Sequence, residues 1–158
     1  MGKPASGVRI RQARVEDAGA LAELATQLGY PSAPDEMAAR LRLILPQPDH
    51  SVLVAEADEG RTCGFAHVSG GIALQSGVRA ELHGLVTDES LRGRGIGARL
   101  VEESERWARA KGFPTLCVRC NLVRTETHRF YERLGYTCSK TQKYFRKSLD
   151  EGGQSDRT

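Results

Sequence analysis

Hydrophobic and polar positions in the N-terminal third of the chain predict one strand and two helices. Apolar and charged residues alternate over residues 8–13, as in a strand with one solvated face. Apolar residues then recur at helical spacing over residues 18–28 and 37–45, and Gly29 and Pro46 end the two runs. The change of period marks where the strand gives way to helix.

The next stretch has the pattern of a β-hairpin followed by a third strand. The apolar runs at residues 52–57 and 63–68 flank a polar turn that contains glycine, which favours a hairpin. Residues 69–77 are glycine-rich and are expected to be a loose connection to a strand over residues 81–87. Gly84 inside that strand indicates a bulge or a close approach of another backbone.

Helical spacing returns twice in the second half of the chain. Residues 96–111 carry an apolar stripe with charged residues outside it, and Gly112 follows as a helix-ending glycine. A strand is expected at residues 115–120, and then a helix over residues 124–134 with Gly135 as its cap.

The C-terminal pattern completes a mixed α/β fold. Two further strands are expected around Thr137 and around Tyr144 and Phe145, which gives about seven strands flanked by four helices. We expect one domain over residues 1–148. Residues 149–158 have nothing to bury and are expected to be a disordered tail.

The junction between the central strand and the third helix is almost without side chains. Gly93, Gly95 and Gly97 lead into the helix, and Arg92 and Arg94 add two cations. A helix N-terminus has unpaired N–H groups and a partial positive charge, so this junction is suited to bind phosphate oxygens.

The spacing of the glycines argues against two common phosphate-binding loops. A Walker A loop requires Gly-Lys followed by Ser or Thr, and the chain contains no such triplet. A dinucleotide site requires Gly-x-Gly-x-x-Gly and an acidic residue roughly 20 positions later, where this chain has the apolar residues 116–118.

The remaining pattern is Arg/Gln-x-x-Gly-x-Gly/Ala, which Arg92, Gly95 and Gly97 satisfy. A second motif lies about thirty residues downstream and consists of Asn121, Phe130, Tyr131, Gly135 and Tyr136. The order and separation of the two motifs resemble those of the GNAT superfamily of N-acetyltransferases, over roughly residues 8–147. The resemblance implies the GNAT-like acyl-CoA N-acyltransferase fold, with acetyl-CoA as co-substrate.

The resemblance also implies which residues bind the coenzyme. The loop amides would bind its pyrophosphate, and the central strand and Asn121 would bind its pantetheine arm. The full set expected from the resemblance is Leu85, Val86, Thr87, Arg92, Gly93, Arg94, Gly95, Ile96, Gly97, Ala98 and Asn121.

Acetyl transfer to an amine requires a proton acceptor. A primary amine resembling lysine has a pKa near 10.4, so roughly one molecule in two thousand is neutral at pH 7. Many enzymes that the chain resembles carry a glutamate at the position of Glu81, which is our candidate base. Strand alternation puts Glu81, His83 and Leu85 on one face, so His83 could replace Glu81 or relay its proton. A solvated strand-end carboxylate and a structural histidine are the alternatives.

Two tyrosines are further candidates for the site. In the family that the chain resembles, the tyrosine at the position of Tyr131 points its hydroxyl at the coenzyme sulfur and can donate a proton to it. The turn that contains Tyr30 would form a wall of the acceptor site, so Tyr30 joins His83 as a candidate substrate-binding residue. The alternative for both tyrosines is simple packing.

Composition narrows the remaining possibilities. The net charge of +3, from 23 basic and 20 acidic residues, is too balanced to indicate nucleic acid. We expect no membrane span and no signal peptide, and hence a cytoplasmic protein. Cys117 and Cys120 have C-x-x-C spacing, but within a strand such residues point to opposite faces, so we expect thiols and no metal site.

The sequence thus predicts an enzyme that moves an acetyl group from acetyl-CoA to a primary amine of a small molecule. Direct attack in a ternary complex is expected, because neither motif contains a cysteine that could carry the acetyl group. Two alternatives stay open: acetylation of a lysine or N-terminus in a protein or peptide, and a non-catalytic module that binds acetyl-CoA. The resemblance further suggests a possible homodimer.

Overall fold

The computed structural model describes residues 7–120 and 124–150 of the 158-residue chain. These residues fall into two compact units, Met1–Cys120 and Asn121–Thr158. The second unit contains α4 (Thr125–Arg133). The first contains, in order, β1 (Arg9–Gln12), η1 (Val15–Asp17), α1 (Ala18–Gln27), α2 (Pro34–Ile44), β2 (His50–Glu56), η2 (Asp58–Gly60), β3 (Thr62–Ala73), β4 (Gly77–Thr87), η3 (Glu89–Leu91), α3 (Ile96–Ala110) and β5 (Leu116–Val118).

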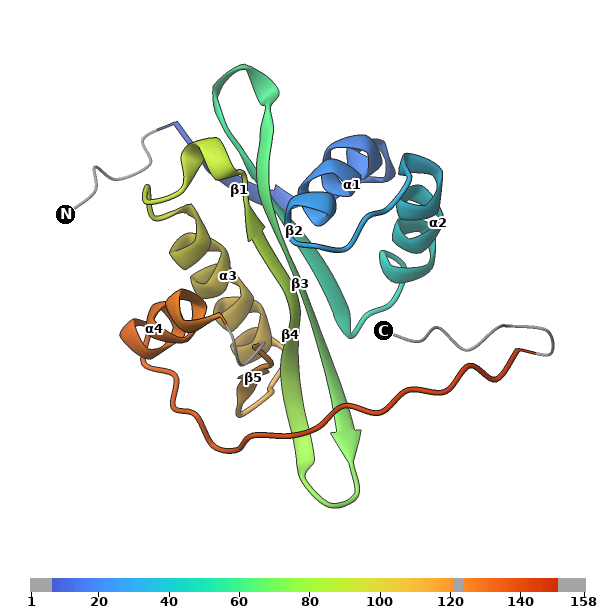
Figure 1. The fold of residues 1–158 in the computed structure, drawn as a ribbon, viewed down its shortest axis with the longest axis vertical. Helices are drawn as coiled ribbons and strands as arrows, with labels where there is room; N and C mark the ends of the chain where they lie inside the picture. The colour runs from blue at the N-terminus through green and yellow to red at the C-terminus, as the bar shows by residue number, and fades with distance from the viewer. Residues whose placement is uncertain (1–6, 121–123, 151–158) are drawn as a thin grey trace. The chain divides into compact units, whose positions relative to one another are not determined.

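The first unit is built on one mixed sheet in the order β1-β2-β3-β4-β5 (Figure 1). Neighbouring strands from β1 to β4 are antiparallel, whereas β5 runs parallel to β4. The predicted hairpin of β2 and β3 is confirmed. The loose connection predicted for residues 69–77 is wrong, because β3 and β4 stay paired as far as Ala73 and Gly77.

A bulge interrupts the pairing of β3 with β4. His67 lies opposite Gly84 and Val68 lies opposite Leu82, so His83 is an extra residue on β4. The bulge predicted from Gly84 is thereby confirmed. It also reverses the alternation beyond it, because Leu85 pairs with Ala66 on the face opposite Glu81. The expectation that Leu85 shares a face with Glu81 is wrong for this reason.

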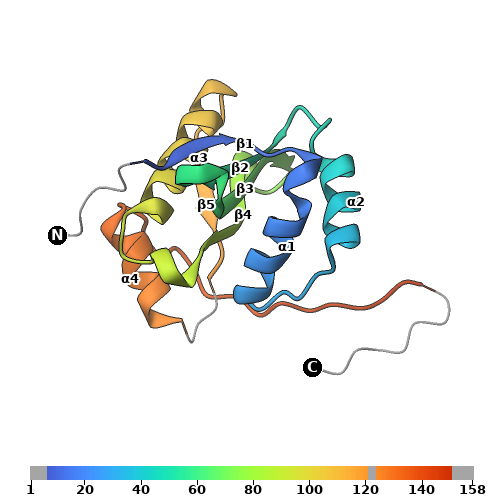
Figure 2. The ribbon, with the colours of Figure 1, turned by 90° about the horizontal axis from the view of Figure 1, so that it is seen from above.

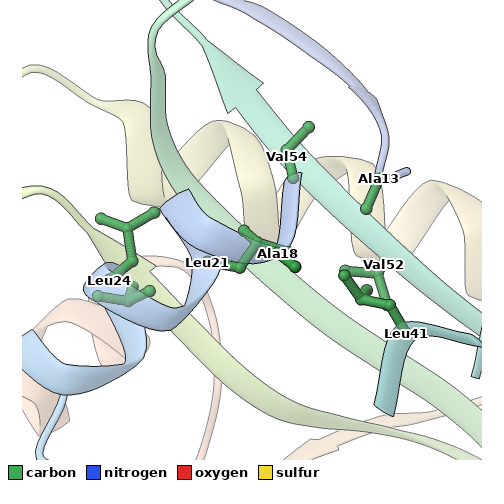
Figure 3. Packing of buried hydrophobic residues seen from close by; sticks show 8 residues of the cluster. Ala13, Ala18, Leu21, Leu24, Leu41, Val52 and Val54 are labelled. Atoms are coloured by element: carbon green, nitrogen blue, oxygen red, sulfur yellow. The ribbon is translucent and has the colours of Figure 1, made fainter. Parts of the chain in front are cut away.

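α1 and α2 cover one face of the sheet, and α3 covers the other (Figure 2). On one face, Val52 and Val54 of β2 pack with Leu21 and Leu24 of α1 and Leu41 of α2 (Figure 3). Each of these side chains is at most 4% exposed. Burial of one such side chain contributes about 1.5–3 kcal/mol, so this cluster fixes α1 and α2 against the sheet.

The opposite face is covered by α3, which packs against β2, β3 and β4. Ile96 and Leu100 are buried on its inner side. They approach β3 closely at Gly64, where an added Cβ would lie 2.9 Å from the carbonyl oxygen of Val86 and 3.2 Å from Leu100. The missing side chain at Gly64 therefore allows the helix to sit near the strand.

The two strands predicted near the C-terminus are not formed. Residues 136–149 have no helix or strand, so the described residues form five strands instead of seven. Tyr144 and Phe145 favour β structure, but a strand is stable only when a neighbour pairs with its backbone. No strand among the described residues pairs with them, and the side chains of Tyr144, Phe145 and Leu149 are exposed.

Candidate active site

The glycine-rich junction predicted from the sequence connects η3 to α3. Gly93 and Gly95 adopt left-handed φ angles of 80° and 79°. A Cβ at either position would meet no atom within 4 Å. The conformation, and not lack of space, therefore requires glycine here, and the backbone of both residues is open to an incoming group.

The N-terminus of α3 presents its backbone N–H groups beside this loop. The helical bond from the N–H of Arg99 to the carbonyl of Gly95 measures 3.1 Å, and the N–H groups of Ile96, Gly97 and Ala98 precede it in the first turn. Gly95 is the N-cap and supplies no side-chain acceptor. These groups can bind an anion, since the positive end of the helix dipole lies here. The exposed side chains of Arg92 and Arg94 flank the loop.

Hydrogen bonds at Asp88 anchor the start of the loop. Its carboxylate accepts from the N–H of Ser90 at 2.9 Å and from Arg61 at 2.9 Å, while its own N–H donates to the carbonyl of Cys63 at 2.8 Å. The bonds from Ser90, and then the Arg61 guanidinium, hold the pKa of Asp88 below its usual range. The loop therefore leaves the sheet from a fixed point.

One edge of β4 is unpaired next to this loop. β5 pairs with β4 only from Ala80 to Leu82. Leu85, Val86 and Thr87 pair with β3 on one side, and no described strand pairs with them on the other. An extended ligand could add to this edge as a further strand would.

Glu81 and His83 lie at the other end of the same edge. His83 Nδ1 is 3.9 Å from Glu81 Oε2, so the structure brings these two predicted site residues together. Arg119 Nη2 lies 3.3 Å from Glu81 Oε1. The side chain of Glu81 is 24% exposed and that of His83 is 39% exposed. An acceptor molecule can therefore reach both.

Sequence reasoning missed Arg119 as a neighbour of Glu81. Cys117 pairs with Glu81 in the parallel register, and Arg119 lies two residues further along the chain, on the same face as Cys117. The strand predicted at residues 115–120 includes Arg119, but one sequence does not show the parallel register that aligns this strand with Glu81.

Sequence reasoning also missed two side chains next to His83, and a third that contacts one of them. Ser69 Oγ lies 2.5 Å from His83 Nε2, and the His67 and His83 rings are 4.8 Å apart. His50 Nδ1 lies 3.0 Å from His67 Nε2. Burial lowers the pKa of His83, an effect that Glu81 opposes and that His50 and Arg119 reinforce. His83 therefore favours its neutral form at pH 7, as a proton acceptor requires.

Tyr30 lies in the connection between α1 and α2. Its N–H donates to the carbonyl of Ala25 at 2.9 Å, and its side chain is 70% exposed. Ser32 donates to the carbonyl of Tyr30 and accepts from Arg40 at 3.0 Å. The backbone of this turn is thus held while the phenol ring faces solvent.

Tyr131 belongs to the second unit and lies on α4, where it is 7% exposed. Its ring makes edge contacts with Phe130 and Tyr136, at centroid distances of 5.1 and 5.6 Å. Gly135, with φ 92°, follows the helix as predicted. Asn121 lies outside the described residues.

Neither a metal centre nor a membrane helix is evident in the described parts of the chain. Among residues 7–120 and 124–150, no group of three His, Cys, Asp or Glu side chains is arranged to hold a metal ion. Within the same ranges, no helix combines the length and the apolar character that crossing a membrane requires.

Comparison with known proteins gives a consistent result. The family model described as "Acetyltransferase (GNAT) family" matches residues 18–136. An aminoglycoside N(6')-acetyltransferase type 1 from Stenotrophomonas maltophilia is 29% identical over 150 residues, covering 92% of this chain and 97% of that protein. One from Serratia marcescens is 27% identical over 130 residues, covering 80% of this chain and 89% of that protein.

Solved structures share the fold. The aminoglycoside N-acetyltransferase AAC(6')-Iy, in complex with a bisubstrate analog, has a TM-score of 0.81 and 24% identity, and the match covers 91% of this chain and 100% of that one. AAC(6')-Ih from Acinetobacter baumannii has a TM-score of 0.79 and 21% identity, with coverage of 91% and 100%. The five-stranded sheet and the helices of this chain therefore have known acetyltransferases as structural counterparts.

Proposed function

The chain belongs to the acetyltransferase (GNAT) family and is an acetyl-CoA-dependent N-acetyltransferase, and from this premise we propose that it acetylates a primary amine of an aminoglycoside. One observation carries the proposal. The unpaired edge of β4 connects the anion-binding loop at the start of α3 with Glu81 and His83. A coenzyme binding surface and a proton acceptor thus lie along one strand.

The residues of the first unit fit acetyl-CoA. We propose that its phosphates bind the N–H groups of Ile96, Gly97 and Ala98, the loop at Gly93 and Gly95, and the cations of Arg92 and Arg94. The edge at Leu85, Val86 and Thr87 would hold its extended arm, and Asn121 would add a hydrogen bond. When bound, acetyl-CoA supplies an acetyl group that is already activated as a thioester.

Glu81 is proposed to take the proton of the acceptor amine. Its carboxylate is accessible, and His83 Nδ1 is 3.9 Å away and can accept the proton in turn. A protonated amine has no lone pair with which to attack. A proton acceptor at this place therefore raises the fraction of bound amine that is neutral and can attack the thioester directly in a ternary complex. Holding the amine at attacking distance contributes several kcal/mol more, on the order measured for oriented reactants.

Tyr131 is proposed to supply a proton from its phenolic oxygen to the leaving sulfur. The support is the motif of Phe130, Tyr131 and Gly135, together with the family to which the chain belongs. Replacing Tyr131 with Phe keeps the ring and its contacts with Phe130 and Tyr136 but removes the hydroxyl. Turnover should fall while the KM for acetyl-CoA changes little; an unchanged kcat would remove Tyr131 from this role.

The acceptor class rests on the relatives. Both curated relatives named above are aminoglycoside N(6')-acetyltransferases, and each is covered over most of its length. This favours a small amine over the lysine or N-terminus of a protein. The exposed ring of Tyr30 is proposed to contact the acceptor from the turn between α1 and α2.

The test is an acetyl-transfer assay that follows thiol release from acetyl-CoA. The panel holds aminoglycosides with a 6'-amino group, matched compounds with a 6'-hydroxyl, polyamines, amino acids and short peptides. We expect turnover with the 6'-amino compounds and loss of it with the 6'-hydroxyl partners. Turnover with peptides alone, or with no amine by folded protein that binds acetyl-CoA, would contradict the proposal.

We further propose that the two units form one domain over residues 1–148 and that the protein acts in the cytoplasm as a homodimer. Support for the dimer is the exposure of Tyr144, Phe145 and Leu149, large apolar side chains that a second copy could cover. Light scattering should give twice the mass of the chain, and the double variant Tyr144→Ser/Phe145→Ser should give one chain. A monomeric wild-type protein at all concentrations would exclude the dimer.

A further inference from the structure

Three histidines from three adjacent strands form a stack on the face of the sheet that α1 and α2 cover further along. They are His50 on β2, His67 on β3 and His83 on β4. The His50 and His67 rings lie 5.2 Å apart at 23°, and the His67 and His83 rings lie 4.8 Å apart at 35°. The stack ends at His83, whose ring lies beside the Glu81 carboxylate.

The strand register explains why these rings meet. His50 pairs with Ser69, and Val52 pairs with His67, so His50 and His67 are diagonal neighbours on one face. The bulge on β4 then inserts His83 opposite this pair.

His83 is held by different groups around its ring. Ser69 Oγ contacts Nε2 at 2.5 Å, Glu81 faces Nδ1 at 3.9 Å, and the ring of His67 covers one side. When Nε2 carries the ring proton and donates it to Ser69 Oγ, Nδ1 is the nitrogen left to take a proton from Glu81. The ring of His67 is in turn fixed by the contact of its Nε2 with His50 Nδ1 at 3.0 Å.

We propose that His67 is a positioning residue for acetyl transfer, which together with Ser69 holds the His83 ring so that Nδ1 receives the acceptor's proton from Glu81. This inference rests on the proposed function. The ammonium group of the acceptor loses one proton to the Glu81 carboxylate, the proton passes to His83 Nδ1, and it leaves from the imidazolium to water. The neutral amine then has its lone pair available for attack.

The charges around the stack are consistent with this role. Burial, with the neighbouring His83 and His50, lowers the pKa of His67 to about 4, so His67 stays neutral at pH 7 and adds no charge beside His83. The other described groups that act on His83 are Glu81 on β4, Arg119 after β5 and His50 on β2. Only Glu81 among them favours the protonated form of His83.

The test compares His67→Ala with His67→Phe and with a control, Glu102→Gln. His67→Ala removes the ring that covers His83, whereas His67→Phe keeps an aromatic ring there and covers the case in which the alanine variant fails to fold. The control changes an exposed carboxylate on α3, outside the histidine stack. The measurements are kcat against pH, the KM for acetyl-CoA, and the His83 tautomer by nitrogen NMR of the coenzyme-free protein.

We expect His67→Ala to lower kcat by about tenfold or more, to leave the KM for acetyl-CoA unchanged and to move the acid limb of kcat to higher pH, because the His83 ring gains water. His67→Phe should restore most of kcat, and Glu102→Gln should resemble the wild type. The His83 tautomer should be mixed only in His67→Ala.

Two results would count against this picture in different ways. If the wild-type protein transfers acetyl groups and both His67 variants leave kcat, its pH profile and the His83 tautomer unchanged, the positioning role is overturned while the proposed function stands. If the folded wild-type protein transfers no acetyl group to any amine, the proposed function itself is overturned, and the positioning role with it.

Discussion

The chemistry of the site depends on the single extra residue in β4. The His83 ring lies beside Glu81 and Ser69 on one face, and because His83 is an extra residue, Leu85 points to the other face, as Leu82 does. A strand of regular pleat also places residues 81 and 83 together, but it would carry Leu85 with them. The polar pair of Glu81 and His83 is thus followed on the same strand by residues 85–87, whose backbone edge is open.

Replacing Glu81 with Gln tests the proposed base. Gln keeps the size of the side chain but cannot accept a proton at pH 7. We expect kcat to fall by about a hundredfold, within the range for loss of a general base, with little change in the KM for acetyl-CoA. Glu102→Gln is the matched control, since Glu102 is exposed on α3. Equal rates for the two variants would move the role to His83.

His67 also predicts a pH dependence of stability. Its pKa is about 4 in the folded protein, mainly because of burial, and about 6.5 in an unfolded chain. The unfolded chain therefore takes up a proton first as the pH falls. Stability from this residue is complete above about pH 6.5 and is lost toward pH 4, by at most about 3 kcal/mol and by less where water screens the ring.

Urea unfolding of the wild type and of His67→Phe at pH values between 7 and 4 measures this effect. The free energy of unfolding should fall less steeply with decreasing pH in the variant, since Phe takes up no proton. Parallel curves for the two proteins would show that His67 is as easily protonated in the folded state as in the unfolded chain.

At the level of elements, the junction of η3 and α3 is the proposed binding site for the coenzyme phosphates. The loop is held at Asp88, turns at the left-handed glycines and delivers the first turn of α3 with its N–H groups exposed to a ligand. Each of these features is local, so a change in one backbone angle should alter binding without disturbing the sheet.

Gly95→Ala should weaken binding through the backbone. Alanine at a φ of 79° costs about 1 kcal/mol or more, and relief of that strain rotates the amides at the start of α3. We expect the KM for acetyl-CoA to rise about tenfold, since 1.4 kcal/mol corresponds to a factor of ten. Gly71→Ala is the control, because Gly71 lies in β3 with open space and an ordinary φ. Equal KM values for both variants would contradict the proposed role of the loop.

Local patterns predicted most of these elements correctly. The hairpin of β2 and β3, the bulge at Gly84, the helix α3 and the glycine that follows α4 all depend on residues close in sequence. The extension of the β3 and β4 hairpin through Ile72 was missed, since three glycines nearby suggested a loop. The two expected C-terminal strands are absent because strand propensity at Tyr144 and Phe145 supplies no pairing partner.

The groups around Glu81 and His83 could not be predicted from the sequence, for a different reason. Arg119 is far from Glu81 along the chain, as His67 is from His83, and only the register of the strand pairs brings them together. A single sequence shows which residues can form a strand but not which strands align. The candidate pair of Glu81 and His83 was predictable because both residues lie on one strand.

At the level of the whole first unit, helices cover both faces of the sheet, and the open part of the β4 edge offers a route for an extended ligand. α1 and α2 cover one face and α3 covers the other, while β5 closes only three positions of the β4 edge. The open part of that edge leads from His83, beside Glu81, to the loop before α3. Seven residues of a strand span about 20 Å, so an elongated molecule is required to use both ends.

Calorimetric titration with CoA tests most directly the claim that this loop and edge bind the coenzyme. Pantetheine, which lacks the phosphates, serves as the comparison. We predict that folded wild-type protein binds one CoA per chain and binds pantetheine at least tenfold more weakly, because the N–H groups of α3 bind the diphosphate. No uptake of CoA, or equal affinity for CoA and pantetheine, would contradict the account.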